Sequence, residues 1–231
     1  MGDRQKKSAL FEEFARIGKA MGHGKRLELI DLLAQGERSV ENLAATAGLG
    51  LSTASAHLQT LKLAGLVTTR KDGARIYYDL AGPDVAGLFH ALRTVARARL
   101  PAVDHKRADY LGIHGSAETD ATGTPLEVTR EELLSRAAAG TVTVLDVRPP
   151  EEYRAAHIPG ALSIPLDELA CRIGELPAGQ EVVVYCRGAY CVLAYEAVDL
   201  LQSAGHRARR LNDGMLEWRL DGLPVDVVRA A

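Results

Sequence analysis

The stretch "VVVYCRGAYCVLA" (residues 182–194) decides the fold of the second half of this chain. Its opening apolar run predicts a buried strand that ends at Cys186. "YCVLAYEAV" then begins a helix, so a short loop joins the end of a strand to the start of a helix. Units of this kind, repeated along a chain, build a parallel sheet with helices on its faces.

The surrounding sequence repeats the same alternation of strand and helix. A capped helix, "VTREELLSRAAAG", precedes the strand "VTVLDVR", and a turn-rich connection leads to the helix "LDELACRIGEL". After residue 194 come the rest of that helix, a strand at "RARRL" and a terminal helix. Residues 125–231 are therefore predicted to form an α/β domain with a parallel sheet.

The loop in the opening stretch carries two cysteines with different expected environments. Cys186 lies where backbone N–H groups and a helix N-terminus converge, a setting that favours an anion and lowers a thiol pKa. Arg187 adds a positive charge, so Cys186 is the expected nucleophile. Cys191 is either a second reactive thiol within reach or a packing residue in the first helical turn. Cys171, at helical spacing, is expected to be buried and inert.

Residues 126–231 resemble rhodanese domains, on the matches "VLDVRPPEEYRAAHIPGALSIPLDEL", "VVVYCRGAYC" and "LNDGMLEW". The resemblance implies a persulfide carried by Cys186, with Asp146 and Arg148 at an early strand end near the active loop. It favours structural roles for Glu152 and His157 in the connecting loop, and a core position for Trp218.

The loop departs from the sulfurtransferase pattern at one position. Thiosulfate-type loops commonly carry a second cation five residues after the nucleophile, and this chain has Cys191 there. That departure puts thiosulfate turnover in doubt. A second thiol could instead attack a persulfide on Cys186, giving a disulfide or a sulfur-bridged link.

The first hundred residues have a different, mainly helical pattern. Helical spacing recurs over residues 8–21, 25–36 and 39–48, and again in "LSTASAHLQTLKLAGLV", where Ser52 is the expected N-cap. "LVTTRKDGARIYYDL" then reads as two strands around Asp72-Gly73, and a last helix runs to Pro101. Helix, helix, turn, helix and basic hairpin is the order of a winged helix-turn-helix domain.

The fourth helix is the expected reading element for double-stranded operator DNA. Its buried face is Ala54, Leu58 and Leu61. The expected DNA-contacting residues on its other faces and on the hairpin are Ser52, Thr53, Ser55, Ala56, His57, Gln59, Arg70, Lys71 and Arg75. Residues 1–110 hold 17 Lys and Arg against 12 Asp and Glu, whereas residues 111–231 hold 11 against 18, so a polyanion is expected at the first half.

Residues 8–100 closely resemble the ArsR/SmtB family of bacterial repressors, on the matches "KRLELIDLL", "SVENLA", "LSTASAHLQTLKLAGLV" and "RKDGARIYY". The resemblance implies a homodimer built through the first and last helices, on an operator of two half-sites about one helical turn apart. The family's cysteine cluster is missing from "SVENLAATAG", and His90 does not match the spacing of its other metal site. We therefore expect the signal to be read in the second domain.

The composition of the whole chain predicts its domain boundaries and its location in the cell. We predict a winged-helix domain at residues 1–102, a linker at 103–124, rich in Gly, Ser, Thr and Asp in its later part, and a rhodanese-like domain at 125–231. Three cysteines in 231 residues fit a reducing compartment, and neither a signal peptide nor a membrane span is expected. The expected location is the cytoplasm, with no cofactor and no metal site.

The leading hypothesis is a dimeric DNA-binding repressor whose rhodanese-like domain senses reactive sulfur species, small thiols or thiol oxidants through Cys186 and Cys191. One alternative is a sulfurtransferase with Cys186 as persulfide carrier and a regulatory winged helix. Another is a soft-ion site on the two thiols, although two thiolates alone leave Zn²⁺ short of four ligands.

Overall fold

The computed structural model describes residues 3–112, 119 and 126–228. The chain divides into two compact units, residues 1–92 and 93–231, and the division falls inside helix α5 (Pro83–Arg99). The predicted boundary at residue 102 lies ten residues further along, because the last turns of α5 pack with the second unit. No helix in the described part of the chain has both the length and the apolar character needed to cross a membrane.

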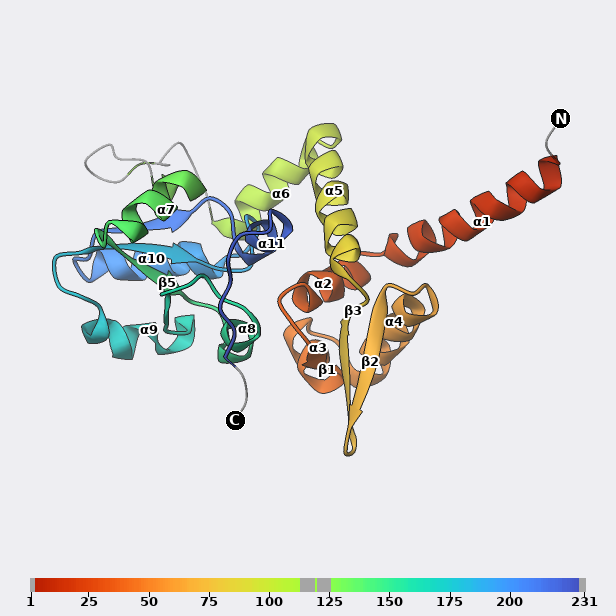
Figure 1. Cartoon of the computed structure of the whole chain (residues 1–231), viewed down its shortest axis with the longest axis horizontal. Coiled ribbons are helices and arrows are strands. Elements are labelled where there is room, and N and C mark those ends of the chain that lie inside the picture. Colours follow the sequence, from red (N-terminus) through yellow and green to blue (C-terminus); the bar gives the residue numbers. More distant parts are fainter. Residues whose placement is uncertain (1–2, 113–118, 120–125, 229–231) are drawn as a thin grey trace. The chain divides into compact units, whose positions relative to one another are not determined.

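The first unit consists of helices of different lengths with an antiparallel hairpin (Figure 1). Its elements besides α5 are α1 (Arg4–Met21), α2 (Gly24–Leu33), β1 (Arg38–Ser39), α3 (Val40–Thr46), α4 (Leu51–Leu63), β2 (Val67–Asp72) and β3 (Arg75–Leu80). Three helices of this unit begin at polar side chains that accept backbone N–H groups: Asp3 Oδ1 accepts Gln5 N, His23 Nδ1 accepts Lys25 N, and Ser39 Oγ accepts Asn42 N. The core lies where α2, α3 and α4 meet, around the fully buried Leu29, Leu43 and Leu58.

The hairpin β2–β3 confirms the turn signal at Asp72-Gly73. Asp72 pairs with Arg75 at the closed end, and Gly73 adopts a φ of +58°, which a glycine adopts without strain. The short strand β1 completes a three-stranded sheet on the β3 side. The first unit is therefore a winged helix-turn-helix fold, with α4 as the second helix of the motif and the hairpin as the wing.

The second unit is built on a five-stranded parallel sheet, in the order β4-β8-β7-β5-β6. Its elements after α5 are α6 (Ala102–Leu111), β4 (Glu127–Val128), α7 (Arg130–Ala138), β5 (Val142–Asp146), α8 (Pro150–Ala155), β6 (Leu162–Ser163), α9 (Leu166–Arg172), the 3-10 turn η1 (Ile173–Glu175), β7 (Glu181–Tyr185), α10 (Leu193–Ser203), β8 (Ala208–Leu211) and α11 (Met215–Leu220). The predicted α/β class with a parallel sheet is confirmed.

The central strand β7 supplies both hydrophobic cores because its side chains alternate between the two faces of the sheet. Val182, Val184 and Cys186 pack with α9 and α10 on one face. Val183 and Tyr185 pack with α7, α8 and α11 on the other. The second core includes Trp218, 1% exposed, which confirms its expected core position.

Two expectations about the second half differ from the structure. The predicted linker at 103–124 begins with an ordered helix, α6, which ends at Gly112 in the left-handed conformation. The later part of the linker, residues 113–118 and 120–125, lies outside the described residues. Cys171 was expected to be buried and is exposed, because the short helix α9 turns only Leu169 fully into the core and Cys171 points elsewhere.

Candidate functional site

The recognition helix α4 has the buried face that the sequence predicted. Ala54, Leu58 and Leu61 are fully buried, which fixes the rotation of the helix in the unit. The residues predicted to meet DNA lie on the other faces: Ser52, Thr53, Ala56 and Gln59 are exposed, and Ser55 and His57 are half-buried. The expected N-cap at Ser52 is wrong by two residues, because the helix starts at Leu51 and Gly50 takes the cap position.

Two of these α4 side chains already have partners within the first unit. Gln59 Nε2 donates to the Tyr78 hydroxyl at 3.0 Å. The His57 ring lies 4.6 Å, centroid to centroid, from the ring of His23, and burial followed by the nearby charges of His23 and Arg26 lowers the pKa of His57. His57 therefore tends to stay neutral and adds little positive charge to α4.

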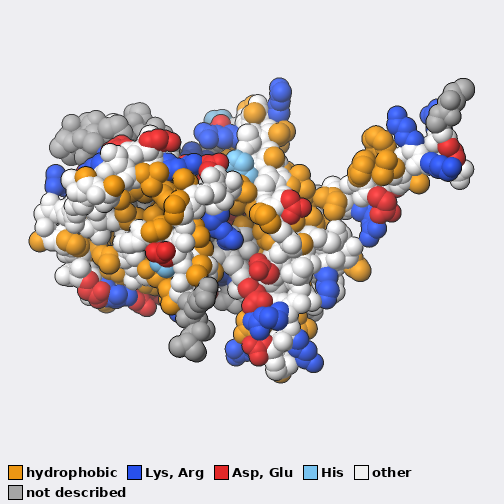
Figure 2. Space-filling view, in the orientation of Figure 1, with side chains coloured by type: hydrophobic (Ala, Val, Ile, Leu, Met, Phe, Trp, Pro, Cys, Tyr) orange, Lys and Arg blue, Asp and Glu red, His pale blue; other side chains and the backbone are white. Residues whose placement is uncertain are grey.

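The wing carries basic and acidic side chains side by side (Figure 2). Lys71 and Arg75 are exposed near the closed end of the hairpin. Arg70 is exposed too, but its guanidinium donates to both oxygens of Glu37 and lies 4.7 Å from the Tyr77 ring centroid. A phosphate would have to compete with Glu37 for Arg70, so Lys71 and Arg75 are the more available cations.

The dithiol loop, residues 186–192, lies between β7 and α10 and has both thiols inside the core. Cys186 and Cys191 are 3% and 8% exposed and belong to the same apolar cluster. Cys186 Sγ lies 3.5 Å from the carbonyl oxygen of Cys191, and the Cys191 N–H closes a turn on the Gly188 carbonyl at 3.0 Å. The structure therefore brings together the two cysteines that the sequence placed in one loop.

The start of α11 clamps the dithiol loop from the other side. The N–H groups of Met215 and Leu216 donate to the carbonyls of Cys186 and Arg187, both at 3.0 Å. Gly214 has no room for a side chain, since a Cβ there would lie 2.2 Å from the nitrogen of Gly188. This close backbone approach explains the glycine in "LNDGMLEW".

The two thiols have opposite pKa shifts. Burial raises the pKa of Cys186 well above 9.0, even though hydrogen bonds from the backbone at Gly188 and Ala194 act the other way. A hydrogen bond from the Cys186 thiol lowers the pKa of Cys191 against the effect of burial, and the charge of Arg187 adds to the lowering. Burial therefore shifts the pKa of Cys186 in the direction opposite to the expected lowering, and the lowered pKa belongs to Cys191.

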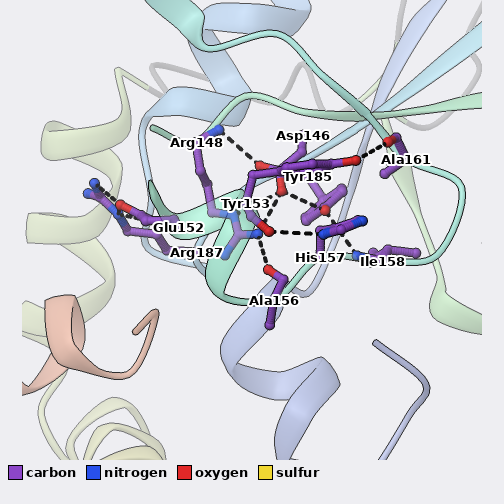
Figure 3. Close-up of polar contacts among 10 residues, drawn as sticks. All are labelled: Asp146, Arg148, Glu152, Tyr153, Ala156, His157, Ile158, Ala161, Tyr185 and Arg187. Atoms are coloured by element: carbon purple, nitrogen blue, oxygen red, sulfur yellow. Dashed lines mark hydrogen bonds and ion pairs between the residues drawn. The ribbon is translucent and has the colours of Figure 1, made fainter. Parts of the chain in front are cut away.

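Arg187 makes its main contact away from the sulfur atoms. Its guanidinium donates twice to Glu152 Oε1, at 2.9 and 2.6 Å, and the Glu152 carboxylate is 1% exposed (Figure 3). A buried carboxylate with this partner fixes the direction of the arginine. Glu152, which is expected to hold the connecting loop in place, therefore also anchors the dithiol loop through Arg187.

Asp146 and Arg148 form a fully buried ion pair at the end of β5 (Figure 3). Arg148 donates to Asp146 through its backbone N–H, Nε and Nη2, and its Nη2 also donates to the Ala156 carbonyl at 2.8 Å. The Tyr185 hydroxyl donates to the same carboxylate at 2.6 Å. Tyr185 precedes Cys186 in the chain, so this network holds the strand end from which the loop departs.

His157 ties the connecting loop, as expected. Its backbone N–H and carbonyl pair with Asp226, and its ring stacks on Tyr153 at 3.7 Å between centroids. No sequence pattern indicated three further residues of this site: Tyr190 within the dithiol loop, and Arg107 and Glu217 packed against it. Each of them depends on an approach between segments far apart in the chain.

A winged helix followed by a parallel α/β domain with a cysteine loop defines a two-domain DNA-binding regulator. Residues 23–69 match the family model of bacterial regulatory proteins of the arsR family, and residues 129–221 match the rhodanese-like domain. The chain is 52% identical over 225 residues to the HTH-type transcriptional regulator Rv0324 of Mycobacterium tuberculosis, covering 97% of this chain and 95% of the relative. The chain belongs to this family of ArsR-type transcriptional regulators with a rhodanese-like domain.

Two further relatives each match one half. A sulfurtransferase of Allochromatium vinosum is 36% identical over 97 residues, which are 41% of this chain and 89% of the relative. The solution structure of the homodimeric winged helix-turn-helix DNA-binding domain Mb0332 of Mycobacterium bovis (fragment 1–100) is 51% identical, covers 43% of this chain and 93% of that one, and has a TM-score of 0.41.

Proposed function

We propose that this regulator is a homodimeric repressor that senses reactive sulfur species through the Cys186–Cys191 pair. The observation that carries the proposal is the pairing of two buried thiols of opposite pKa shift in one short loop. A thiolate with a protonated neighbour is equipped for two successive exchange steps at one site. Polysulfides and persulfides, which carry sulfane sulfur, are the substrates that such a pair would meet.

The chemistry balances with polysulfide as the oxidant. The thiolate attacks the terminal sulfur of a polysulfide, so that a protein S–S bond forms and the shortened polysulfide leaves with the electron pair. The second thiol then attacks the Sγ atom of the persulfidated cysteine, so that the bond between the two cysteine sulfurs forms, the bond to the outer sulfur breaks, and that sulfur leaves as hydrosulfide with the electron pair. The result is a Cys186–Cys191 disulfide, and the polysulfide sulfur is reduced to sulfide.

The dimer is supported by hydrophobic side chains that gather along α1 (Figure 2). Leu10, Phe11 and Phe14 are between 53% and 60% exposed, and Leu88 and Leu92 on α5 are also exposed. Apolar side chains clustered at this exposure call for a partner surface. A second copy of the chain is the partner we propose, in agreement with the resemblance to dimeric repressors.

The test is DNA binding before and after polysulfide. The probe is a duplex selected by the full-length protein from a random-sequence pool. We expect polysulfide to change the affinity of the wild type by about 5- to 150-fold, the usual range of allosteric coupling. Cys186→Ser and Cys191→Ser should lose the response, and Cys171→Ser, which alters the exposed cysteine outside the loop, should keep it. An unchanged wild-type affinity would overturn the proposal.

A second candidate function is sulfur transfer, favoured by the similarity to the Allochromatium vinosum sulfurtransferase over 97 residues. In this case Cys186 or Cys191 carries a persulfide that is passed to an acceptor thiol or cyanide in many cycles. Robust multiple turnover from any sulfane donor would favour the enzyme. A single stoichiometric modification per chain would favour the sensor.

A further inference from the structure

Side chains from three helices converge on the middle of the dithiol loop. The Arg93 guanidinium of α5 lies 4.3 Å from the ring centroid of Tyr190, and the Arg107 guanidinium of α6 lies 5.8 Å from it. Arg107 Nε also approaches the Ala189 carbonyl at 3.4 Å. Ala189 and Tyr190 both lie between Cys186 and Cys191, so these contacts fall inside the segment that a disulfide would close.

Glu217 of α11 connects Arg93 to the backbone of the same loop. Arg93 Nη2 donates to Glu217 Oε1 at 3.2 Å, with side-chain exposures of 15% and 9%. The other carboxylate oxygen accepts the Gly214 N–H at 3.2 Å, next to the point where Gly214 meets Gly188. Burial raises the pKa of Glu217, and the charge of Arg93 acts in the opposite direction.

Arg107 reaches past the loop to the first turns of α10. Its Nη2 donates to the Tyr195 hydroxyl at 3.0 Å. The guanidinium of Arg210 lies 4.0 Å from the centroid of the same Tyr195 ring. The loop is thus held between α6 on one side and the start of α10 on the other. Cation–π contacts of this kind are directional, and a rotated ring weakens them.

Helix α5 runs without interruption from Pro83 to Arg99. Its residues up to Leu92 belong to the first unit, and Arg93 is the first residue of the second. The half of α5 that carries the exposed Leu88 and Leu92 is the surface we propose for dimer contact. A change at Arg93 therefore acts on the helix that also carries the proposed dimer-contact residues Leu88 and Leu92.

We propose that Arg93, Arg107 and Glu217 are positioning residues for the dithiol loop, and that Tyr190 passes the state of the two cysteines to α5. This inference rests on the proposed sulfur-sensing function. Forming a disulfide requires Cα atoms within about 7 Å and a fixed Cβ–S–S–Cβ angle. Closing this bond across residues 186–191 is expected to shift the residues between the cysteines and to move Tyr190 away from the guanidinium of Arg93.

The test compares Tyr190→Leu with Tyr190→Phe in the full-length dimer. Leucine removes the aromatic face, whereas phenylalanine keeps it, so the conservative variant should rescue the contact with Arg93. We expect mass spectrometry to show that polysulfide modifies the same cysteines in Tyr190→Leu as in the wild type. The factor by which polysulfide changes the duplex affinity should be at least fivefold smaller in this variant. Tyr190→Phe should respond as the wild type does. Tyr110→Leu, the same substitution at an exposed tyrosine of α6, is the matched control.

Arg93→Gln provides a second variant outside the loop, and hydrogen exchange provides a second readout. In the wild type, polysulfide should change the exchange of the amides at residues 93–99, and Arg93→Gln should abolish that change while both cysteines still react. If the wild type does not respond to polysulfide at all, the proposed function fails. If the wild type responds, and Tyr190→Leu and Arg93→Gln respond by the same factor, the function stands and this inference is wrong.

Discussion

Two arginine–carboxylate pairs in this protein have the same shortest N···O distance, 2.6 Å, in opposite surroundings. Arg148 and Asp146 have side chains that are 0% exposed, at the end of a central strand of the rhodanese-like domain. Arg70 and Glu37 have side chains that are 53% and 32% exposed, at the wing of the DNA-binding domain. The comparison teaches that contact geometry alone does not set the energy of an ion pair. Desolvation does, because a buried charge that loses its partner cannot be rescued by water.

The two pairs also differ in what they can do for function. Asp146 accepts hydrogen bonds from Arg148 and Tyr185, and no other partner could replace all of them inside the core. The Arg70 guanidinium can leave Glu37 for a phosphate at little cost, since both groups are already partly hydrated. Burial thus makes one pair a fixed support of the dithiol loop and leaves the other exchangeable at the wing, where contact with DNA is predicted.

The largest effect is expected for Asp146→Ala, which leaves Arg148 buried without its carboxylate. We expect a loss of about 3–5 kcal/mol in the free energy of unfolding of the rhodanese-like domain. Denaturant unfolding followed by the fluorescence of Trp218 measures this domain selectively, because Trp218 is the single tryptophan of the chain and lies in its core. A loss below about 1 kcal/mol, the scale of a surface pair, would show that the buried pair is not a support.

Replacing both charges sharpens this test. The double variant Asp146→Leu with Arg148→Met removes the pair without leaving a lone charge. It should therefore be less destabilised than Asp146→Ala alone, since a buried pair and a hydrophobic replacement of similar volume are often close in stability. A double variant that is worse than the single one would assign the loss to packing and not to the unpaired guanidinium.

The next largest effect is expected for Gly214→Ala, which tests the clamp on the dithiol loop. A Cβ at Gly214 would lie 2.2 to 2.6 Å from backbone atoms of Arg187 and Gly188, and backbone cannot rotate away as a side chain can. We expect a loss of about 3 kcal/mol, the upper part of the range for overpacking, with faster alkylation of both loop cysteines. Gly174→Ala is the matched control, because a Cβ there meets nothing within 4 Å. Equal stability of the two variants would contradict the clamp.

A smaller effect concerns the pH dependence of the two thiols. The pKa of Cys191 is lowered and that of Cys186 is raised from 9.0, so as the pH rises Cys191 should be alkylated before Cys186. The thiolate of Cys191 contributes stability above the pKa that this thiol has in the unfolded chain, and the contribution is lost as the pH falls through the lowered pKa of the folded state.

Cys186→Ala removes the hydrogen-bond donor and should raise the pKa of Cys191, whereas Cys186→Ser keeps a donor and should raise it less. Mass spectrometry of the alkylated peptide against pH measures both, with Cys171 as an exposed internal standard. Alkylation of Cys186 first would contradict the assignment.

Much of the fold could be predicted from local patterns. The Asp72-Gly73 turn, the buried face of α4 and the strand before Cys186 each follow from residues close together in the chain, and all three are confirmed. The helix in the predicted linker was missed because α6 is polar over most of its length, so its periodicity is weak. Cys171 was misplaced because a helix of seven residues is too short for spacing alone to define its buried face.

The candidate site was predictable only in part, and for a definite reason. The sequence placed Cys186 and Cys191 in one loop, but it could not show that both are buried. Burial reverses the expected shift at Cys186, because desolvation there outweighs the hydrogen bonds from the backbone. The contacts of Tyr190 with Arg93 and Arg107 could not be predicted either, because they join segments more than eighty residues apart in the sequence.

The smallest effect on stability is expected for Glu37→Ala, the exposed counterpart of Asp146→Ala. Removing this carboxylate should leave thermal unfolding of the winged-helix domain almost unchanged, because water replaces the lost partner of Arg70. Its effect should appear in DNA binding, where Arg70 no longer has to give up Glu37 to meet a phosphate. We expect tighter binding to the selected duplex at low salt, and a dependence of log affinity on log salt that is steeper by about one unit. Arg70→Gln in the Glu37→Ala background should restore the shallower slope. An unchanged slope in Glu37→Ala would place Arg70 away from the DNA and leave Lys71 and Arg75 as the cations of the wing.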